Sequence, residues 1–324
     1  MKSFRAHRLS GSELLALEEV AAPMPAPGQV LIAVAAAGVH LADFAAVAGE
    51  RSPRPAVPFT PGLEVAGTVA ALGEGVTGLK RGQRVAAFVA WGGLAEQVVT
   101  AAELCVALPD GLADAQAASL PVAYGGAILA LREKAGLAAG ETVLVMGAGG
   151  FTGLAAIETA KQLGARTIAV AGGEARLALA SDYGADHIID ASSGVLGDAV
   201  RAVTGDKGVD VIFDPVGGDA FDAAMGAAAI GARFVSAGFA AGRVPRVNLA
   251  ALFARDMYLV AANVPLTVQS HGARARAALE DAVAWAAAGK THPRIAVKFP
   301  LAQARQAFDY VKQRRGNGAV VVTM

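Results

Sequence analysis

Residues 141–165 read ETVLVMGAGGFTGLAAIETAKQLGA, and this stretch decides the fold of the chain. An apolar run, TVLVM, is followed by a glycine-rich turn and then by a run of helix-forming residues. Ala148, Gly150 and Gly153 occupy the three positions of a G-x-G-x-x-G fingerprint, with alanine at the first position. A strand, a glycine turn and a helix in this order predict the phosphate-binding unit of a dinucleotide-binding fold.

Each residue of this turn has a physical task in such a unit. Gly150 lets the backbone approach a pyrophosphate, and Gly153 lets the helix pack tightly against its strand. The backbone amides of Phe151 and Thr152 lie at the positive helix N-terminus, where they point at the phosphates. A tight turn in an α/β protein that binds no nucleotide gives a similar pattern. The spacing of the next apolar run, RTIAVAG, favours nucleotide binding.

The rest of the chain shows two different patterns of secondary structure around this unit. From about Asp114 onward, helical stretches alternate with strand-like runs such as RTIAVAG, DVIFDPV and RFVSAG, which is typical of a parallel, doubly wound sheet. The first third has short apolar runs separated by Gly and Pro, which indicates a β-rich unit. The residues after Asn263 again show the pattern of the first third. We therefore expect a nucleotide domain, residues 119–263, inserted into a β-rich domain of residues 1–118 and 264–324.

Composition excludes several classes of protein. Hydrophobic residues make up 54% of the 324 residues and charged residues 17%, so we expect compact folding without long disordered segments. Lys plus Arg equals Asp plus Glu at 28 each, and the absence of a basic run argues against a nucleic-acid partner. The N-terminus does not read as a signal peptide, and the uncharged stretches are too short to span a membrane. We therefore expect a cytoplasmic protein.

The end of the strand after the helix bears on the choice of nicotinamide cofactor. An acidic residue at this point holds the adenosine ribose of NAD and repels a 2′-phosphate. This sequence has Ala171, Gly172 and Gly173 there, and Arg176 follows one helical turn later. The pattern favours NADPH. Two alternatives stay open: Glu174 as a helix cap or ribose contact, and Arg176 as a solvated helix residue.

Several segments resemble landmarks of one enzyme family in the order in which that family has them. They are PFTPGLEVAGTVAALGEGVTGLKRGQRVAAF, GGLAEQVV, ALPDGLADAQAASLPVAYGGA, VDVIFDPVGG, GARFVSAGFAAG and RRGNGAVVVT. Together they resemble the zinc-independent quinone oxidoreductases of the medium-chain dehydrogenase/reductase superfamily. The resemblance implies an α/β protein with a GroES-like, β-rich catalytic domain and an inserted Rossmann domain. It also implies that nicotinamide and substrate lie in a cleft between the two.

The resemblance further implies a site without zinc. Zinc-dependent cousins carry a Cys at the position of His40, a His at Leu63, and a second Cys near Val122 and Ala123. One histidine and Glu64 cannot assemble a tetrahedral catalytic zinc site. The chain's single cysteine excludes a multi-cysteine zinc lobe. Reduction of a quinone or a similar activated C=C or C=O acceptor is therefore the expected chemistry.

Four cofactor contacts come from the resemblance alone. It implies that Gly238, Phe239 and Asn263 border the nicotinamide, and that Arg314 reaches the cofactor phosphates. The chain departs from the family at Gly126, where relatives usually have Thr.

Two residues are candidates to donate a proton or a hydrogen bond to the substrate. His40 stands where relatives usually have Asn, and an imidazole titrates near neutral pH. The alternative is a hydrogen-bonded histidine packed between the domains. Tyr124 could donate from its hydroxyl. The alternative is that Tyr124 has a structural role between the domains.

These features together predict an NADPH-dependent reductase that transfers hydride directly to a small-molecule electron acceptor. A reductase of enoyl thioesters or α,β-unsaturated ketones is an alternative, because it uses the same fold and hydride step. A non-catalytic NADPH-binding protein is another. The uncharged run YLVAANVPL is suited to pairing across a two-fold axis, so we expect a homodimer.

Overall fold

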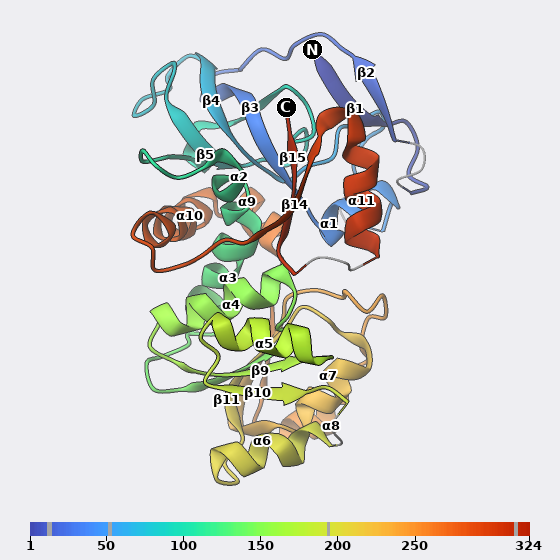
Figure 1. Ribbon diagram of the computed structural model, residues 1–324, viewed down its shortest axis with the longest axis vertical. Helices are drawn as coiled ribbons and strands as arrows, with labels where there is room; N and C mark the ends of the chain where they lie inside the picture. The colour runs from blue at the N-terminus through green and yellow to red at the C-terminus, as the bar shows by residue number, and fades with distance from the viewer. Residues whose placement is uncertain (12–14, 51–53, 193–194, 314–316) are drawn as a thin grey trace. The chain divides into compact units, whose positions relative to one another are not determined.

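A computed structural model describes residues 1–11, 15–50, 54–192, 195–313 and 317–324. The chain divides into two compact units, Met1–Gly125 with Pro265–Met324, and Gly126–Val264 (Figure 1). The first is built on antiparallel sheet and the second on a parallel sheet. The predicted fold class, a β-rich domain with an inserted Rossmann domain, is confirmed. The limits predicted for the two functional domains stay a prediction.

The β-rich unit contains a two-stranded and a seven-stranded sheet. The small sheet pairs β1 (Lys2–Ala6) with β2 (Leu15–Glu19). The large sheet has the order β14 (Ile295–Pro300), β15 (Ala319–Thr323), β3 (Gln29–Val39), β4 (Glu64–Leu72), β5 (Arg84–Phe88) and β7 (Cys105–Ala107), and β6 (Gln97–Ala101) also pairs with β3. The last strand of the chain, β15, therefore lies beside β3, with Val321 opposite Gly38. The tail completes the sheet that the first third begins.

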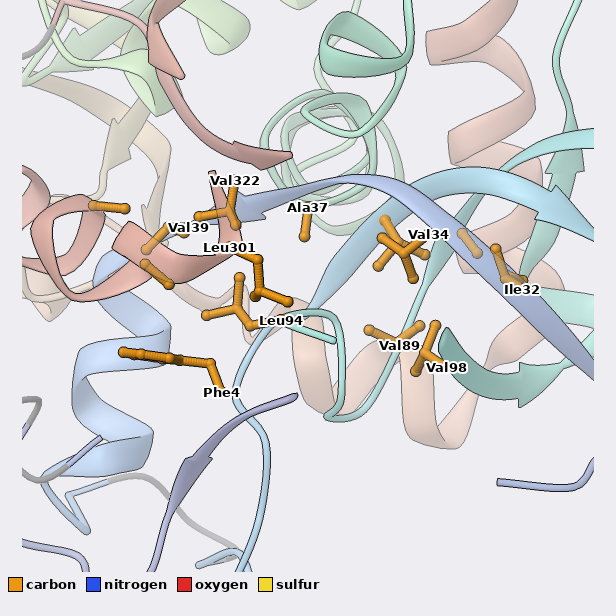
Figure 2. Packing of buried hydrophobic residues seen from close by; sticks show 14 of the residues in the cluster. Phe4, Ile32, Val34, Ala37, Val39, Val89, Leu94, Val98, Leu301 and Val322 are labelled. Carbon is orange, nitrogen blue, oxygen red and sulfur yellow. The ribbon is translucent and has the colours of Figure 1, made fainter. Parts of the chain in front are cut away.

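The core of this unit joins segments from both ends of the chain. Buried and half-buried residues alternate along most of β3, as expected for a strand with one face on a core. Figure 2 shows side chains from the N-terminal third meeting side chains from the C-terminal tail: Phe4, Ile32, Val34, Ala37, Val39, Val89, Leu94, Val98, Leu301 and Val322.

The helices of the β-rich unit are mostly short. They are α1 (Leu41–Val47), α2 (Asp114–Ala117), α10 (Gly272–Ala287) and α11 (Ala304–Lys312), with a π-helical stretch at Leu120–Gly125 and 3₁₀ turns at Ala102–Leu104 and Leu301–Gln303. α9 (Val264–Ser270) begins at the boundary between the units. In the part of the chain that the structure describes, no helix is both long enough and apolar enough to cross a membrane.

The inserted unit is a six-stranded parallel sheet. Its order is β10 (His187–Asp190), β9 (Arg166–Ala171), β8 (Thr142–Met146), β11 (Val209–Asp214), β12 (Ala228–Ser236) and β13 (Tyr258–Ala261). Its helices are α3 (Gly126–Ile128), α4 (Phe151–Gln162), α5 (Glu174–Asp182), α6 (Leu196–Thr204), α7 (Gly218–Met225) and α8 (Leu249–Phe253), with a π-helical stretch at Leu129–Lys134. Strand order reverses between β8 and β11, and such sheets bind ligands at this point, beyond the carboxyl ends of the strands.

Both faces of this sheet are buried. Along β8, Val143 and Val145 belong to one apolar cluster, whereas Leu144 and Met146 belong to another. Successive side chains of a strand point to opposite faces, so each cluster covers one face. This explains why the strand runs are continuously apolar instead of alternating.

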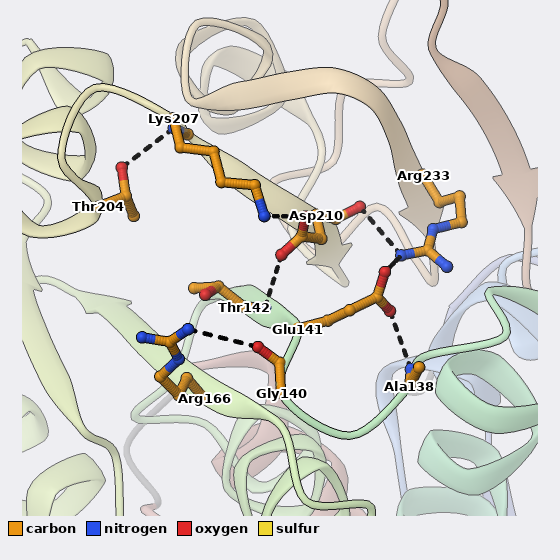
Figure 3. A network of polar contacts seen from close by, with 10 residues as sticks. Ala138, Gly140, Glu141, Thr142, Arg166, Thr204, Lys207, Asp210 and Arg233 are labelled. Carbon is orange, nitrogen blue, oxygen red and sulfur yellow. Dashed lines mark hydrogen bonds and ion pairs between the residues drawn. The ribbon is translucent and has the colours of Figure 1, made fainter.

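A polar network ties together the amino ends of the strands (Figure 3). Arg233 pairs with Glu141 at 2.5 Å and also donates to the carbonyl oxygen of Ala135 at 3.0 Å. Asp210 accepts the backbone N–H of Thr142 at 2.8 Å and the Lys207 ammonium at 2.8 Å. These charges bind one another and the backbone at this end of the sheet. The glycine turn lies at the opposite end.

Candidate functional site

The glycine turn connects β8 to α4 through a backbone conformation that favours glycine. Gly147 has φ +62°, in the left-handed region. The N–H of Gly150 donates to the carbonyl oxygen of Gly147 at 3.0 Å, and Ala148, which is buried, donates to Val170 of β9 at 2.9 Å. The turn is thus bonded to the neighbouring strand. The fingerprint positions did not single out Gly147, although it is the residue whose φ requires glycine.

Helix α4 begins immediately after the turn and packs closely on it. A Cβ atom added to Gly153 would lie 2.5 Å from the Gly147 carbonyl oxygen and 2.7 Å from the Ala148 Cα. A Cβ at Gly150 would meet nothing nearer than that same oxygen, at 3.4 Å. Gly153 is therefore needed for packing, while the space beside Gly150 is open to a ligand. Phe151 and Thr152, both partly buried, form the first turn of α4.

The carboxyl end of β9 is also open. Among the described residues, no atom beyond the chain neighbours lies within 4 Å of a Cβ added to Gly172 or Gly173. Gly173, at φ +86°, is the N-cap of α5. Arg176 is exposed on the first turn of that helix, and its Cβ lies 2.5 Å from where a Cβ of Gly149 would be. The structure therefore brings the stem of Arg176 over the glycine turn.

The residues expected at the nicotinamide follow β12 and β13. Gly238 and Phe239 come shortly after β12, and a Cβ on Gly217 would lie 3.1 Å from the Phe239 ring. Asn263 comes two residues after β13 and is exposed. Because the sheet is parallel, these residues lie at the same edge as the glycine turn. Arg314 lies outside the described residues, so its expected contact stays a prediction.

In the β-rich unit, a buried carboxylate holds His40. The imidazole Nε2 of His40 lies 2.5 Å from Oε1 of Glu64, and Oε2 of Glu64 accepts the backbone N–H of Val122 at 2.7 Å. Glu64 is fully buried, whereas the side chain of His40 keeps 14% of its surface exposed. The positions where zinc-dependent cousins carry their first and last ligands are thus bridged by one glutamate.

A second buried carboxylate fixes the backbone around His40. Asp43, in the first turn of α1, accepts the backbone N–H of His40 at 2.9 Å and that of Gly62 at 3.0 Å. Burial raises the pKa of Asp43, although the His40 charge and both hydrogen bonds act in the opposite direction. Asp43 therefore joins the backbone at His40 to the loop that contains Gly62.

Gly38 makes room for the glutamate. A Cβ on Gly38 would lie 1.9 Å from Oε1 of Glu64, so no larger residue fits there while the carboxylate keeps its place. Gly38 and His40 are two residues apart, and both contact Glu64. From the sequence, Glu64 is recognisable only as an insufficient zinc ligand, and its pairing with His40 is not predicted. A glutamate inside an apolar strand run, LEVAG, was the available signal.

The charge state of His40 depends on this pair. Burial alone lowers the pKa of His40, but the charge of Glu64 and the hydrogen bond to it outweigh that effect and raise the pKa above its usual 6.5. Glu64 therefore favours the protonated form of His40, which has a proton to donate.

Neither Tyr124 nor a group of metal ligands has a role that the structure assigns. Tyr124 is fully buried in the π-helical stretch Leu120–Gly125. Within the described residues, no three His, Cys, Asp or Glu side chains gather in a way that could hold a metal ion. Burial raises the pKa of the Cys105 thiol to about 12, so this cysteine is a poor source of a thiolate ligand.

Family models match both units of the chain. Residues 26–110 match the model described as alcohol dehydrogenase GroES-like domain, and residues 152–281 match the model described as zinc-binding dehydrogenase. The chain is 35% identical over 311 residues to quinone oxidoreductase-like protein 2 of Bos taurus. That alignment covers 96% of this chain and 89% of the relative.

Solved structures match the chain over its full length. A mycobacterial protein complexed with NADPH is 29% identical, with a TM-score of 0.93 and coverage of 100% of both chains. The quinone oxidoreductase of Escherichia coli complexed with NADPH is 26% identical, with a TM-score of 0.93 and the same coverage.

Replacing Glu64 with Gln tests the origin of the His40 charge. We expect the pKa of His40 to fall in Glu64→Gln, because the opposing charge is lost while burial remains. NMR titration of the His40 ring signals, assigned with His40→Asn, measures this shift. The stability contributed by the wild-type pair is fully present below pH 6.5 and is lost as pH rises through the raised pKa. The stability gap between wild type and variant should therefore shrink with rising pH.

The control is Glu18→Gln, because Glu18 also lies 2.5 Å from a histidine, His7, but on the surface. This change should leave the His40 titration as it is in the wild type. An unchanged His40 pKa in Glu64→Gln would show that the pair does not set the charge of the imidazole.

Proposed function

The chain is an oxidoreductase that belongs to the quinone oxidoreductase family of medium-chain dehydrogenases/reductases, and from this premise we propose that it transfers hydride from NADPH to a quinone or a similar activated C=C or C=O acceptor without zinc. The family resemblance of its sequence segments is thereby confirmed. The observation that carries the proposal is the glycine turn at the strand-order reversal, with open space at Gly150, Gly172 and Gly173.

The residues at this edge fit a dinucleotide. The N-terminus of α4 offers the amides of Phe151 and Thr152 to a pyrophosphate, and the open backbone at Gly150 leaves room for it. Arg176 supplies positive charge for the 2′-phosphate beside Gly172. NADPH, when bound, supplies the hydride. Two structural neighbours were solved with NADPH, which supports the same cofactor for this chain.

Gly238, Phe239 and Asn263 are the proposed neighbours of the nicotinamide, and Arg314 is a further proposed phosphate contact. The first three lie at the carboxyl edge of the parallel sheet, where a dinucleotide that begins at the glycine turn extends.

His40 is the proposed donor to the acceptor oxygen. Its imidazole is partly exposed and held by Glu64, which raises its pKa, whereas the Tyr124 hydroxyl belongs to a fully buried residue. Donation by His40 stabilises the negative charge that develops on the oxygen when hydride reaches the acceptor. Glu64 and Asp43 act through His40 as positioning residues.

The donor set around His40 supports chemistry without zinc. Leu63 and Val122 offer no metal ligand from their side chains, and Glu64 already accepts hydrogen bonds from the His40 ring and the Val122 amide. Hydrogen-bond donation by His40 takes the place that a Lewis acid has in the zinc-dependent cousins.

An apolar patch on the inserted unit supports a homodimer. β13 is an edge strand, and Tyr258 and Leu259 on it are exposed. The preceding helix α8 buries none of its residues and presents Leu249 and Phe253, the latter 90% exposed. An unpaired edge strand beside an apolar patch is suited to pairing with a second copy.

Catalysis is tested by following NADPH oxidation with quinones, enones and enoyl-CoA esters. We expect turnover with quinones, no stoichiometric zinc by metal analysis, and full activity in the presence of chelator. Gly150→Val is the control, because its side chain occupies the space of the pyrophosphate and should abolish NADPH binding. Preferred turnover of enoyl-CoA would favour the thioester reductase, while one zinc per chain with chelator-sensitive turnover would contradict the zinc-free mechanism.

Cofactor choice is tested with Arg176→Ala. Losing one partly exposed phosphate contact costs about 1.5 to 3 kcal/mol, so NADPH should bind roughly ten- to a hundredfold more weakly, with NADH nearly unchanged. The matched control is Arg166→Ala, which removes the same charge from the opposite end of β9. Fluorescence titration at low and high salt measures both cofactors, and high salt should reduce the difference. Equal NADPH affinity in wild type and Arg176→Ala would show that Arg176 does not contact the 2′-phosphate.

The dimer is tested with Leu259→Asp, which places like charges opposite each other if two copies of β13 pair. Sedimentation at micromolar concentration should show a dimer for the wild type and a monomer for this variant. Ile188→Asp is the control, because Ile188 lies on the other edge strand and is 46% exposed, compared with 43% for Leu259. A monomeric wild type, or loss of the dimer only in Ile188→Asp, would rule out pairing through β13.

A further inference from the structure

The strand next to β9 ends in a carboxylate that the fingerprint does not include. Asp190 is the last residue of β10, and in the parallel pairing it stands opposite Ala171, the last residue of β9. The following N–H, that of Ala191, donates to the carbonyl oxygen of Ala171 at 3.0 Å. Asp190 is therefore fixed beside the open backbone of Gly172 and Gly173, where the adenosine ribose of a dinucleotide is expected.

Local hydrogen bonds hold this carboxylate in place. Oδ1 of Asp190 accepts the backbone N–H of Ser192 at 2.8 Å and the Ser192 hydroxyl at 2.7 Å, and the carboxylate also accepts the N–H of Gly173. The Ser192 N–H is the largest of the effects that lower the pKa of Asp190. The side chain is accordingly ionised at neutral pH.

This arrangement acts against a 2′-phosphate in two ways. The N–H of Gly173, at the N-cap of α5, already donates to Asp190 and is therefore not available to a phosphate. The phosphate would also meet a negative charge, and a phosphate monoester itself carries about −1.5 to −2 at pH 7. Arg176 attracts the same group from the first turn of α5. The two side chains therefore have opposite effects on one ligand group.

We infer that Asp190 is a selectivity residue of the adenosine-ribose site, which lowers the affinity for a 2′-phosphate and so limits the preference for NADPH over NADH. A dinucleotide-binding sheet that prefers NAD carries its carboxylate at the end of the strand that follows the glycine-turn helix. Here that strand, β9, ends without one, and the neighbouring strand supplies it. The inference rests on the proposed dinucleotide site.

Two small probes test the inference without turnover and without nicotinamide. Adenosine 2′,5′-bisphosphate carries the 2′-phosphate, and adenosine 5′-monophosphate lacks it. Asp190→Asn keeps an oxygen for the N–H groups of Ser192 and Gly173 but removes the charge. By calorimetric titration at low salt, the bisphosphate should bind about three- to tenfold more tightly to the variant, while the monophosphate changes less than about twofold. High salt should reduce the gain.

Asp182→Asn is the matched control, because it removes one negative charge from the exposed C-terminal end of α5, far from Gly173 at its N-cap. Thermal unfolding checks that both variants keep the wild-type fold. Asp182→Asn should leave both affinities unchanged. An unchanged or lower bisphosphate affinity in Asp190→Asn, or an equal gain in Asp182→Asn, overturns the inference and leaves the proposed function standing. If the unmodified protein binds neither probe nor NADPH, the proposed function fails and the inference fails with it.

Discussion

The close contact between α4 and the turn after β8 is the constraint on which the inserted unit depends. Gly153 has no side chain, so the helix begins directly above the Gly147 carbonyl. Its N-terminal amides therefore lie at the carboxyl edge of the sheet, next to the reversal of strand order. A helix displaced by one methyl group would move these amides away from that edge. The position of an anion at this edge is thus determined by packing inside the unit.

The β-rich unit is organised by a different requirement, namely the need to satisfy a buried charge. A carboxylate as buried as that of Glu64 is costly unless hydrogen bonds and an opposite charge surround it. His40 and the Val122 amide supply these partners, and the missing side chain at Gly38 supplies the space. Two segments of the chain, residues 38–40 and Val122, are therefore held to the strand that carries Glu64. A histidine so constrained has a raised pKa and keeps a defined orientation, and both properties favour its action as a hydrogen-bond donor.

The sequence predicted the fold well because its strongest signals are local and periodic. The apolar run before Gly147, the glycine spacing and the alternation of strands and helices all follow from backbone geometry. The C-terminal residues were expected to complete the first sheet because their pattern of strands resembles that of the first third. The candidate site was only partly predictable. Glu64 and Asp190 were missed as functional groups because their partners, His40 and Gly173, are distant in sequence and become neighbours only through strand pairing. Tyr124 illustrates the opposite limit, since a motif position does not reveal that the residue is fully buried.

The pairing of β15 with β3 has a consequence for how the protein is made. Residues 319–323 are translated only after the whole inserted unit, yet they lie between β14 and β3 in the large sheet that the first third begins. During synthesis the inserted unit, which is contiguous, can fold as soon as it emerges, because domains generally fold as units. Until residues 319–323 have been made, residues 36–39 of β3 lack the strand with which they pair in the folded protein. The nascent chain therefore passes through a stage in which the dinucleotide unit is complete and the other unit still needs protection from aggregation.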